Sequence, residues 1–511
     1  MQNKNKILLM FLTLFSINAV FAAPVFAEEI ETTEQSAEEQ QLETDAETEI
    51  EEPLATTRDI AGPAITDGWW QDVMYIVDGH SVSGFYDIDN ITYYFDPLTN
   101  LLQKGQQKIG KYWYYFDSET GAMAKSEFIN LTAEENPEGA KTSYYDEFGH
   151  MLYGLQTIDG NLYYLKKWDG ALQHGHQKVD GYWYYFDKFS GAATRAQFRV
   201  LEVGEAGDAP KTVYFDQNGH LLYGIQKIND QIYYLKKGSG ALQTGHLKVD
   251  KKWYYFDKET GAAKKSEFYT LTKADTNDGP KTVYFDQNGH MLYGLRKINN
   301  NYYYFKNGSG ALQKNTSSSE NHRIYRTDNS GIVYSTVVND VPYYAQYNSE
   351  WGNTRVGGYT IKSSGCSVMV GTSIINFVTG RQDHPQYIAF RFHDDFNSYN
   401  ANGIFGTTSD VWRKVAKDYD MRFESGMNYA RIQDHLRQGH LIKTSVKAGT
   451  FVDRGTHALL LMGLDNKNRT YVYDPNNKGK NGWYSLDTFW NEQSSHSDDT
   501  RDGGPFFALW R

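Results

Sequence analysis

A long internal repeat limits what this chain can fold into. The aromatic segment WYYFD occurs at residues 113–117, 183–187 and 253–257, each copy 70 residues after the one before. A segment that starts at Gly149 and another that starts at Tyr93 also recur every 70 residues. Because the period does not drift, repeats of equal length must be joined end to end, each stacking on its neighbours.

Each long repeat contains about three shorter units with an aromatic triplet, a polar turn containing glycine and an apolar pair. Alternating Tyr and Phe favour strands, and turns of this composition favour hairpins. A single hairpin is only marginally stable in water. We therefore expect residues 67–314 to form a β-hairpin solenoid whose neighbouring units share an aromatic core.

The repeated aromatic residues have two interpretations. Most of them should simply pack the stack, since large aromatic side chains stabilise by burial. Rings that stay half exposed in grooves between hairpins could instead bind the apolar faces of sugars or a quaternary ammonium. The candidate ligand-binding residues are one Trp and one Tyr of each WYYFD copy: Trp113, Tyr115, Trp183, Tyr185, Trp253 and Tyr255.

The pattern Tyr-Tyr-Phe-Asp…Gly, with turns such as those at 108–110 and 178–181, resembles the cell-wall-binding and glucan-binding repeats of Gram-positive surface proteins. The resemblance covers about residues 68–314. The choline-binding branch of that superfamily has a Gly-Trp pair ahead of each aromatic triplet. The matching pairs of this chain are Gly105-Gln106, Gly175-His176 and Gly245-His246. The resemblance therefore implies a glucan or another cell-wall carbohydrate, in preference to choline, as the partner.

The N-terminal residues predict export. Lys4 and Lys6 precede an apolar core at 7–15, and small-residue cleavage sites follow, after Ala22 or Ala27. An uncleaved membrane anchor is the alternative, but this core is short for a bilayer and no later stretch approaches spanning length. We predict a signal peptide at residues 1–27 and a secreted chain without a membrane span.

An acidic segment follows the signal. Residues 28–52 contain twelve Asp and Glu but no Lys or Arg, and few bulky apolar groups, so we predict a disordered spacer at 28–66. This segment accounts for the net charge of -12, and the rest of the chain is close to neutral. The folded part therefore offers no electrostatic basis for binding nucleic acid or anionic lipid.

The composition changes again after the repeats. A polar run at 315–320 suggests that residues 315–337 are a linker, although 325–334 could form one last hairpin. From residue 341 there is less Tyr, more aliphatic residues, and a mixture of helical and strand patterns. Residues 338–511 are enough for one hydrophobic core, and we expect an α+β domain there.

Cys366 is the only cysteine of the chain and cannot form an internal disulfide. The cap and turn residues Ser363, Ser364 and Gly365 precede it, and an apolar run with helical character follows. We therefore expect its thiol in the first turn of a helix, where the peptide dipoles favour the thiolate. A free thiol of this kind is a candidate nucleophile.

A thiol nucleophile needs a base, and the base needs an orienting group. His457 starts one predicted strand, and Asp474 ends the next strand of the same hairpin. The start of one antiparallel strand and the end of the next lie at the same edge of a sheet, so these side chains should meet. Taken alone, His457 could be an ordinary strand-end histidine and Asp474 a strand-ending turn. Together with Cys366 they favour a catalytic set.

The segments at 341–351, 364–367, 456–458 and 473–475 resemble the double-glycine, bacteriocin-processing-like cysteine peptidases of papain-like fold. The resemblance covers about residues 338–511. The sequence has no phosphate-binding loop and no cysteine-based metal cluster, so we expect no cofactor and no metal. In that family Cys is the nucleophile, His its base, Asp orients the His, and an upstream Gln supplies the oxyanion hole. By motif these roles fall to Cys366, His457, Asp474 and Gln346. The membrane helices and ATPase of the transporter members are not found in this sequence, so leader processing during transport is not implied.

These features together predict an exported cysteine hydrolase, acting on a peptide or amide bond and held noncovalently at the Gram-positive cell wall by its repeats. The alternative is a glucan-binding adhesin whose terminal domain is catalytically inactive. The complete Cys–His–Asp set favours the enzyme. A peptide or a peptidoglycan-linked group would be the substrate, and the scissile bond, or transfer in place of hydrolysis, stays open.

Overall fold

The computed structural model describes residues 66–136, 139–205 and 209–511. The predicted signal peptide and, apart from residue 66, the predicted acidic spacer lie outside the described residues. Within the described ranges, no helix is both long and apolar enough to cross a membrane. Residues 66–71 and 75–81 belong to one compact unit, and residues 72–74 and 82–511 belong to a second.

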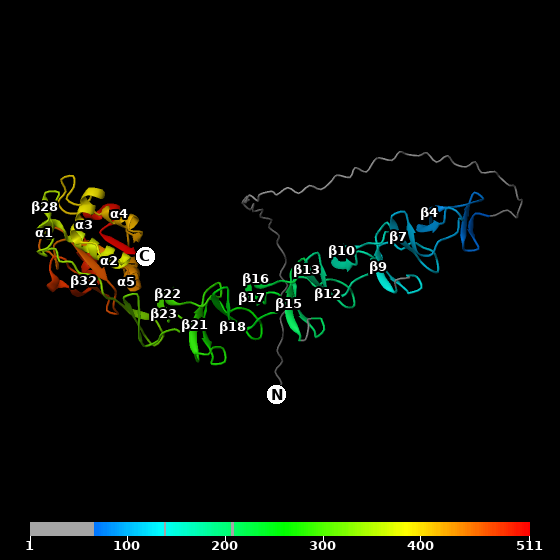
Figure 1. The fold of residues 1–511 in the computed structure, drawn as a ribbon, viewed down its shortest axis with the longest axis horizontal. Coiled ribbons are helices and arrows are strands. Elements are labelled where there is room, and N and C mark those ends of the chain that lie inside the picture. Colours follow the sequence, from blue (N-terminus) through cyan, green and yellow to red (C-terminus); the bar gives the residue numbers. More distant parts are fainter. Residues whose placement is uncertain (1–65, 137–138, 206–208) are drawn as a thin grey trace, which may run out of the picture. The chain divides into compact units, whose positions relative to one another are not determined.

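The first unit contains most of a small three-stranded sheet formed by β1 (Gly68–Trp70), β2 (Met74–Val77) and β3 (His80–Ser81). In the second unit, ten antiparallel hairpins are found among the described residues between 84 and 305, in chain order from blue to green in Figure 1. Each hairpin is a two-stranded sheet of its own.

Their strands are β4 (Gly84–Ile88), β5 (Ile91–Phe95), β6 (Gly105–Ile109), β7 (Tyr112–Phe116), β8 (Glu127–Leu131), β9 (Lys141–Tyr145), β10 (Gly154–Ile158), β11 (Asn161–Leu165), β12 (Gly175–Val179), β13 (Tyr182–Phe186), β14 (Gln197–Leu201), β15 (Lys211–Phe215), β16 (Gly224–Ile228), β17 (Gln231–Leu235), β18 (Gly245–Val249), β19 (Lys252–Phe256), β20 (Glu267–Leu271), β21 (Lys281–Phe285), β22 (Gly294–Ile298) and β23 (Asn301–Phe305).

The hairpin turns use left-handed backbone. Between β12 and β13, Val179 pairs with Tyr182, which leaves Asp180 and Gly181 as the turn residues with φ of 49° and 89°. Two successive residues with positive φ give a turn whose twist matches that of the strands, and Asp-Gly adopts it easily. The glycine-containing turn at 178–181 is therefore where the chain reverses.

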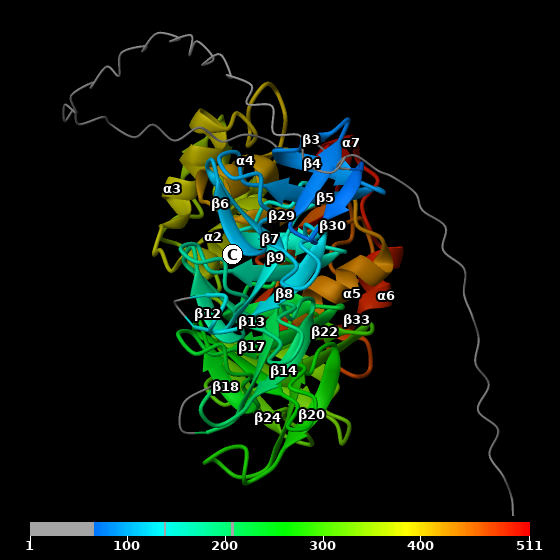
Figure 2. The same ribbon diagram turned by 90° about the vertical axis from the view of Figure 1, so that its right-hand side faces the viewer.

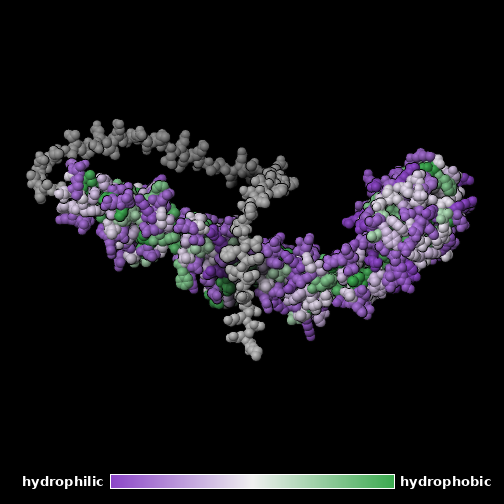
Figure 3. Space-filling view, turned by 180° about the vertical axis from the view of Figure 1, so that it is seen from behind, coloured by the Kyte–Doolittle hydropathy of each residue, from purple (hydrophilic) through white to green (hydrophobic). Residues whose placement is uncertain are grey.

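An aromatic core lies between neighbouring hairpins. Tyr185 is fully buried and packs with Leu201 and Phe215 of the next hairpin, and Tyr115 and Tyr255 lie in corresponding clusters. Figure 3 shows hydrophobic side chains at the surface of the repeats only as small areas among hydrophilic ones. The predicted solenoid of hairpins with a shared aromatic core is confirmed.

Residues 315–337, predicted as a linker or a last hairpin, contain most of a three-stranded sheet. Its strands are β24 (Ser317–Glu320), β25 (Arg323–Thr327) and β26 (Val333–Val338). Thr336 of β26 also exchanges both main-chain hydrogen bonds with Leu464, at 2.8 and 3.0 Å. The last sheet of the repeat region is thus bonded directly to the domain that follows.

That domain, drawn from yellow to red in Figure 1, is built on a six-stranded antiparallel sheet of order β29-β34-β30-β31-β32-β33. Its elements are β27 (Arg355–Val356), β28 (Tyr359–Thr360), α1 (Ile361–Ser364), α2 (Cys366–Thr379), α3 (Pro385–Phe390), η1 (Arg391–Asp395), α4 (Val411–Asp418), β29 (Arg422–Glu424), α5 (Tyr429–Gln438), β30 (Leu441–Val446), β31 (His457–Met462), β32 (Arg469–Tyr473), η2 (Lys478–Lys480), β33 (Gly482–Ser485), α6 (Leu486–Asn491), α7 (Ser497–Thr500), η3 (Arg501–Gly503) and β34 (Phe506–Trp510).

Two hydrophobic cores sandwich this sheet. Helices α2, α3 and α4 pack on one face, where Ile374 of α2 shares a cluster with Leu460 of β31. Helices α5 and α6 pack on the other face, where Leu436 shares a cluster with Leu461. Figure 2 shows the two groups of helices on opposite sides of β30. The expected α+β domain is confirmed.

Replacing Tyr185 by Ala tests the aromatic core. Tyr185 is 0% exposed, so the change leaves a cavity, and we expect it to lower the free energy of unfolding by about 3 kcal/mol. The measurement is urea unfolding followed by tryptophan fluorescence. Phe189→Ala is the matched control, since this ring is 84% exposed and its loss should change stability by less than about 0.5 kcal/mol. Equal effects of the two changes would contradict the assignment of Tyr185 to the core.

Candidate active site

The candidate nucleophile starts a helix. Cys366 is the first residue of α2 and follows the N-cap residue Gly365. A Cβ atom at residue 365 would lie 2.6 Å from the carbonyl oxygen of Ile361, so glycine is needed for the tight passage from α1 to α2. The thiol is half-buried and, as expected from the sequence, lies where the helix dipole favours its ionised form.

The structure brings His457 and Asp474 together. His457 is the first residue of β31, and Asp474 directly follows β32, so the pairing of these two strands places both at one edge of the sheet. The Nε2 atom of His457 lies 2.7 Å from Oδ1 of Asp474. The two residues are 5% and 0% exposed, which keeps water from competing for this contact.

Neighbouring groups hold Asp474 in one orientation. Its Oδ1 atom also accepts the main-chain N–H groups of Asn476 and Asn477, at 2.8 and 3.1 Å. Its own N–H donates to the side chain of Asn481, and its carbonyl oxygen accepts the hydroxyl of Tyr343, both at 2.8 Å. These bonds limit the rotation of the Asp474 carboxylate and keep one of its oxygens directed at the imidazole.

Besides its contact with Asp474, the imidazole of His457 is influenced by the thiol of Cys366. Burial lowers the pKa of His457, but the bonds to Asp474 and Cys366 outweigh burial and raise it to about 9. Burial raises the pKa of Cys366, but the hydrogen bond and charge of His457 and the N–H of Ala458 reverse this and hold the pKa below its usual value. Both shifts favour a thiolate–imidazolium pair near neutral pH.

Gln346 is hydrogen-bonded to the segments that carry Asp474 and Cys366. It is 5% exposed, its N–H donates to the carbonyl of Pro475 at 2.8 Å, and its side-chain Nε2 donates to the carbonyl of Lys362 at 3.0 Å. The indole of Trp351 fixes the preceding carbonyl, that of Ala345, at 2.8 Å. A primary amide has two N–H donors, and the bond to Lys362 uses one of them.

The aromatic residues predicted to bind ligand have two environments. Tyr115, Tyr185 and Tyr255 are buried in the repeat core, while the Trp of each copy is only partly buried against the same clusters. The half-buried indoles of Trp183 and Trp253 are stacked by the rings of His176 and His246, each with ring centres 4.4 Å apart. The histidines at the Gly-His pairs therefore cover these tryptophans.

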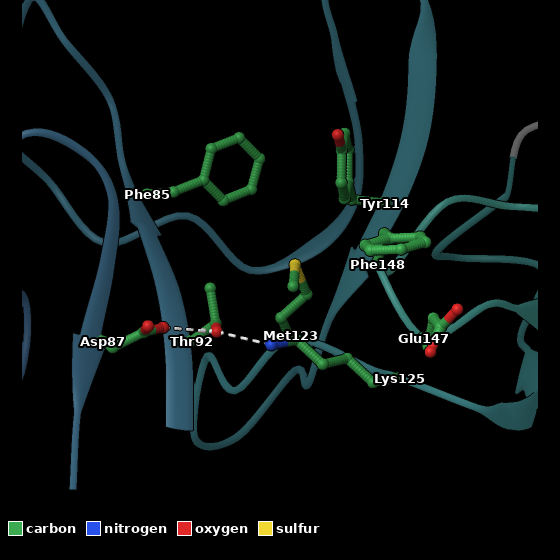
Figure 4. A pocket seen from close by; sticks show the side chains of 8 residues that line it. All are labelled: Phe85, Asp87, Thr92, Tyr114, Met123, Lys125, Glu147 and Phe148. Carbon is green, nitrogen blue, oxygen red and sulfur yellow. Dashed lines mark hydrogen bonds between the residues drawn. The ribbon is translucent and has the colours of Figure 1, made fainter. Parts of the chain in front are cut away.

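A different aromatic set lines a pocket of about 330 Å³ in the first repeat. Phe85 of β4, Tyr114 of β7 and Phe148 surround it together with Met123 (Figure 4). The rings of Phe85 and Tyr114 have centres 5.0 Å apart, and Phe85 and Phe148 are 44% and 63% exposed. This set offers aromatic faces at the surface.

One edge of this pocket is polar. Lys125 donates to the hydroxyl of Thr92 at 2.7 Å, and Thr92 donates to Asp87 at 2.5 Å (Figure 4). Glu147 lies on the same lining. Aromatic faces beside charged and hydroxyl groups suit a ligand with both an apolar face and polar substituents.

These pocket residues were not among the predicted ones, although the sequence contains a signal for them. At the equivalent positions of the next two repeat copies, Tyr114 is matched by Tyr184 and Tyr254, but the other members of the set are replaced. The replacements are Leu155 and Ile225 for Phe85, Ala193 and Ala263 for Met123, and Asn218 and Asn288 for Phe148. Comparing the copies position by position would have separated the first groove from the later two.

Within the described ranges, no group of three or more His, Cys, Asp or Glu residues is arranged to hold a metal ion.

Comparison with known families identifies both parts of the chain. The family model described as choline-binding repeat matches residues 82–128, 152–198 and 271–317, and a putative cell wall binding repeat matches residues 244–263. The model described as Peptidase_C39 like family matches residues 338–497. The chain thus carries choline-binding-type cell-wall repeats followed by a Peptidase_C39-like domain, and both resemblances are confirmed.

Glucosyltransferase-S of Streptococcus mutans is 30% identical over an alignment of 256 residues that covers 45% of this chain and only 16% of the relative's own length. Among solved structures, CbpJ of Streptococcus pneumoniae matches 51% of this chain and 96% of its own, with 22% identity and a TM-score of 0.34. Choline binding protein F of the same organism, with a peptidoglycan analogue present, matches 52% and 96%, with 23% identity and a TM-score of 0.33.

Replacing His457 by Ala tests the ion pair through the alkylation of Cys366 by iodoacetamide. In the unchanged protein we expect Cys366 to react faster than a free thiol at pH 6 to 7, because its pKa is lowered. Without the imidazolium, burial becomes the main influence on the pKa of Cys366 and raises it. The pH at which alkylation accelerates should then move above about 8.5, the range of a free thiol. The measurement is the alkylation rate between pH 5 and 10.

The control for this experiment is His322→Ala, which removes an exposed histidine of the last repeat sheet. It should leave the profile unchanged. If His457→Ala also leaves the profile unchanged, the assignment of His457 as the partner of the thiol is wrong.

Proposed function

We propose that this chain is an exported cysteine hydrolase that cleaves a peptide or amide bond and is retained at the Gram-positive cell wall by its carbohydrate-binding repeats. The observation that carries the proposal is the contact of 2.7 Å between His457 and Asp474, together with the lowered pKa that the same imidazole gives to Cys366 at the start of α2. The match to a Peptidase_C39-like family supports it.

The geometry supports acyl transfer through a thioester. The thiolate of Cys366 attacks the carbonyl carbon of the substrate, and the carbonyl oxygen becomes an oxyanion. The free N–H of Gln346 and the main-chain N–H groups at the start of α2 stabilise that charge. The His457 imidazolium gives its proton to the leaving amine as the C–N bond breaks.

Water completes the cycle. Neutral His457 takes a proton from a water molecule, whose oxygen attacks the thioester carbon. The carboxylic acid leaves, and Cys366 returns as the thiolate beside a protonated imidazole. Asp474 keeps the ring oriented and stabilises its positive charge in each half of the cycle, and it needs no proton of its own.

The repeats supply retention. Single contacts between an aromatic face and a sugar are weak, but several along one chain raise the overall affinity through high effective concentration. The pocket of Phe85, Tyr114 and Phe148 supports a ligand with an apolar face and polar edges. The match to a glucosyltransferase supports glucan as the ligand class, and the choline-binding repeat model keeps choline as the second candidate.

A second candidate function is a wall-binding adhesin with an inactive terminal domain. The extent of the repeats, with ten hairpins among the described residues, favours it, because binding alone would explain them. A measurement of hydrolysis distinguishes the enzyme from the adhesin.

Replacing Cys366 by Ala tests the enzyme. Because no other thiol exists in the chain, we expect hydrolysis to fall by at least 10³-fold while wall binding is unchanged. The measurement is a digest of wall peptides and a peptide library by the full chain, read by mass spectrometry. Equal hydrolysis by the variant would reject the hydrolase, and absence of hydrolysis by both proteins would favour the adhesin.

Replacing Phe85 by Ala tests the pocket. Loss of one stacking face should weaken retention on dextran about 5-fold or more, the cost of roughly 1 kcal/mol for a ring contact. The measurement is the elution volume of the chain on dextran and on choline resin. Phe189→Ala, an exposed ring outside the pocket, is the control and should elute unchanged. Retention by choline alone would replace glucan with choline as the ligand.

A further inference from the structure

Lys443 is a buried charge that the mechanism above does not use. It lies in β30 and is 1% exposed. Its ammonium lies 5.5 Å from the ring centre of Trp412 and 5.3 Å from that of Phe507, both of which are fully buried. It donates a hydrogen bond to the hydroxyl of Ser445.

A charge in this place is costly. An ammonium removed from water loses hydration that only close pairing can replace. Two aromatic faces and one hydroxyl recover part of that loss. The carboxylate of Asp499 acts on Lys443 through space, and it accepts the hydroxyl of Ser494 at 2.7 Å. An apolar side chain would fill the same space without the cost, so packing does not account for the charge.

The register of β30 and β31 links Lys443 to the strand that carries His457. Ser445, which accepts the hydrogen bond of Lys443, pairs directly with Ala458 across β30 and β31. Cys366 packs against the hydrophobic cluster that contains Ala458, Trp412 and Phe507, and the N–H of Ala458 contributes to the lowered pKa of the thiol. The next pair along the same strands contains His457.

We propose that Lys443 is a positioning residue of the cysteine site, whose buried ammonium stabilises the thiolate of Cys366 through space. This inference rests on the proposed hydrolase function, in which the thiolate is the nucleophile. Each group acts on the other. The charge of Lys443 contributes to the lowered pKa of Cys366, and Cys366 partly offsets the lowering of the Lys443 pKa by burial.

Few other titratable groups face these two residues. His457 faces the thiol from β31, and Tyr399 faces it from the segment after η1, with its pKa raised by burial to about 12. Asp499 of α7 faces Lys443. Because Tyr399 is neutral near pH 7, the positive charges that act on the thiolate there are those of His457 and Lys443.

The support depends on pH. Burial is the main cause that lowers the pKa of Lys443, to about 8. The ammonium is therefore present below pH 8 and is lost as the pH rises through that value. Its effect on the thiolate should be full in the neutral and mildly acidic range and should vanish above about pH 9.

The test is Lys443→Met in the full chain. Methionine has a similar length and no charge, and replacing a buried charge by an apolar side chain of similar volume is often neutral or stabilising. We expect the urea midpoint to stay equal or rise, while alkylation of Cys366 by iodoacetamide at pH 6 slows about tenfold, which corresponds to one pKa unit. The two rates should converge above pH 9.

Lys447→Met, which removes an exposed lysine just beyond the same strand, is the matched control and should change neither measurement. Ser445→Ala is the second variant, because it releases the ammonium from its hydroxyl with little change in volume, and it should slow alkylation at pH 6 about two- to threefold. An unchanged alkylation profile in folded Lys443→Met overturns the proposal. If Lys443→Met does not fold, an unchanged profile in Ser445→Ala overturns it.

These measurements use thiol reactivity and no substrate. A chain that alkylates as expected but hydrolyses nothing would refute the proposed function and leave the role of Lys443 standing. If the chain hydrolyses peptides but the alkylation profile of the variants is unchanged, the role of Lys443 is refuted and the proposed function stands.

Discussion

The hydrogen bond between His457 and Asp474 is the interaction on which the candidate site depends. The two residues are 17 positions apart in the chain and lie on neighbouring antiparallel strands, so the hairpin itself sets their distance. The thiol reaches them by a longer route, because α2 must pack its apolar side on the same sheet. Local pairing thus builds the base and its orienting group, and tertiary packing delivers the nucleophile.

This difference explains how much of the site the sequence predicts. His457 and Asp474 follow from the strand pattern, and the helix start at Cys366 follows from its cap residues. Gln346 lies outside helices and strands, where no periodicity places a side chain, so only the family resemblance assigned it. Lys443 was missed because every residue of β30 is buried, and a lysine in a strand is ordinarily expected on its exposed face.

In the repeats the period predicts the hairpins and their turns but not which rings remain accessible. Strand alternation would place Tyr115 and Phe116 on opposite faces with one of them exposed, yet both are buried. Each hairpin is covered on two sides by its neighbours, which a single strand pattern does not reveal. The pocket of Phe85, Tyr114 and Phe148 draws on several hairpins, so it depends on contacts between units and on how the copies differ.

Two cations around one thiolate have a consequence for reactivity. A lower thiol pKa raises the fraction of thiolate but makes each thiolate a weaker nucleophile, so the best attacking thiol has a pKa near the ambient pH. His457, with a pKa of about 9, remains charged at neutral pH. Lys443, with a pKa of about 8, begins to lose its charge just above neutrality. Below about pH 8, the charged Lys443 stabilises the thiolate. Above that pH, the neutral Lys443 no longer lowers the pKa of the thiol, which ionises there without it. The thiolate that forms at the higher pH is then the stronger nucleophile.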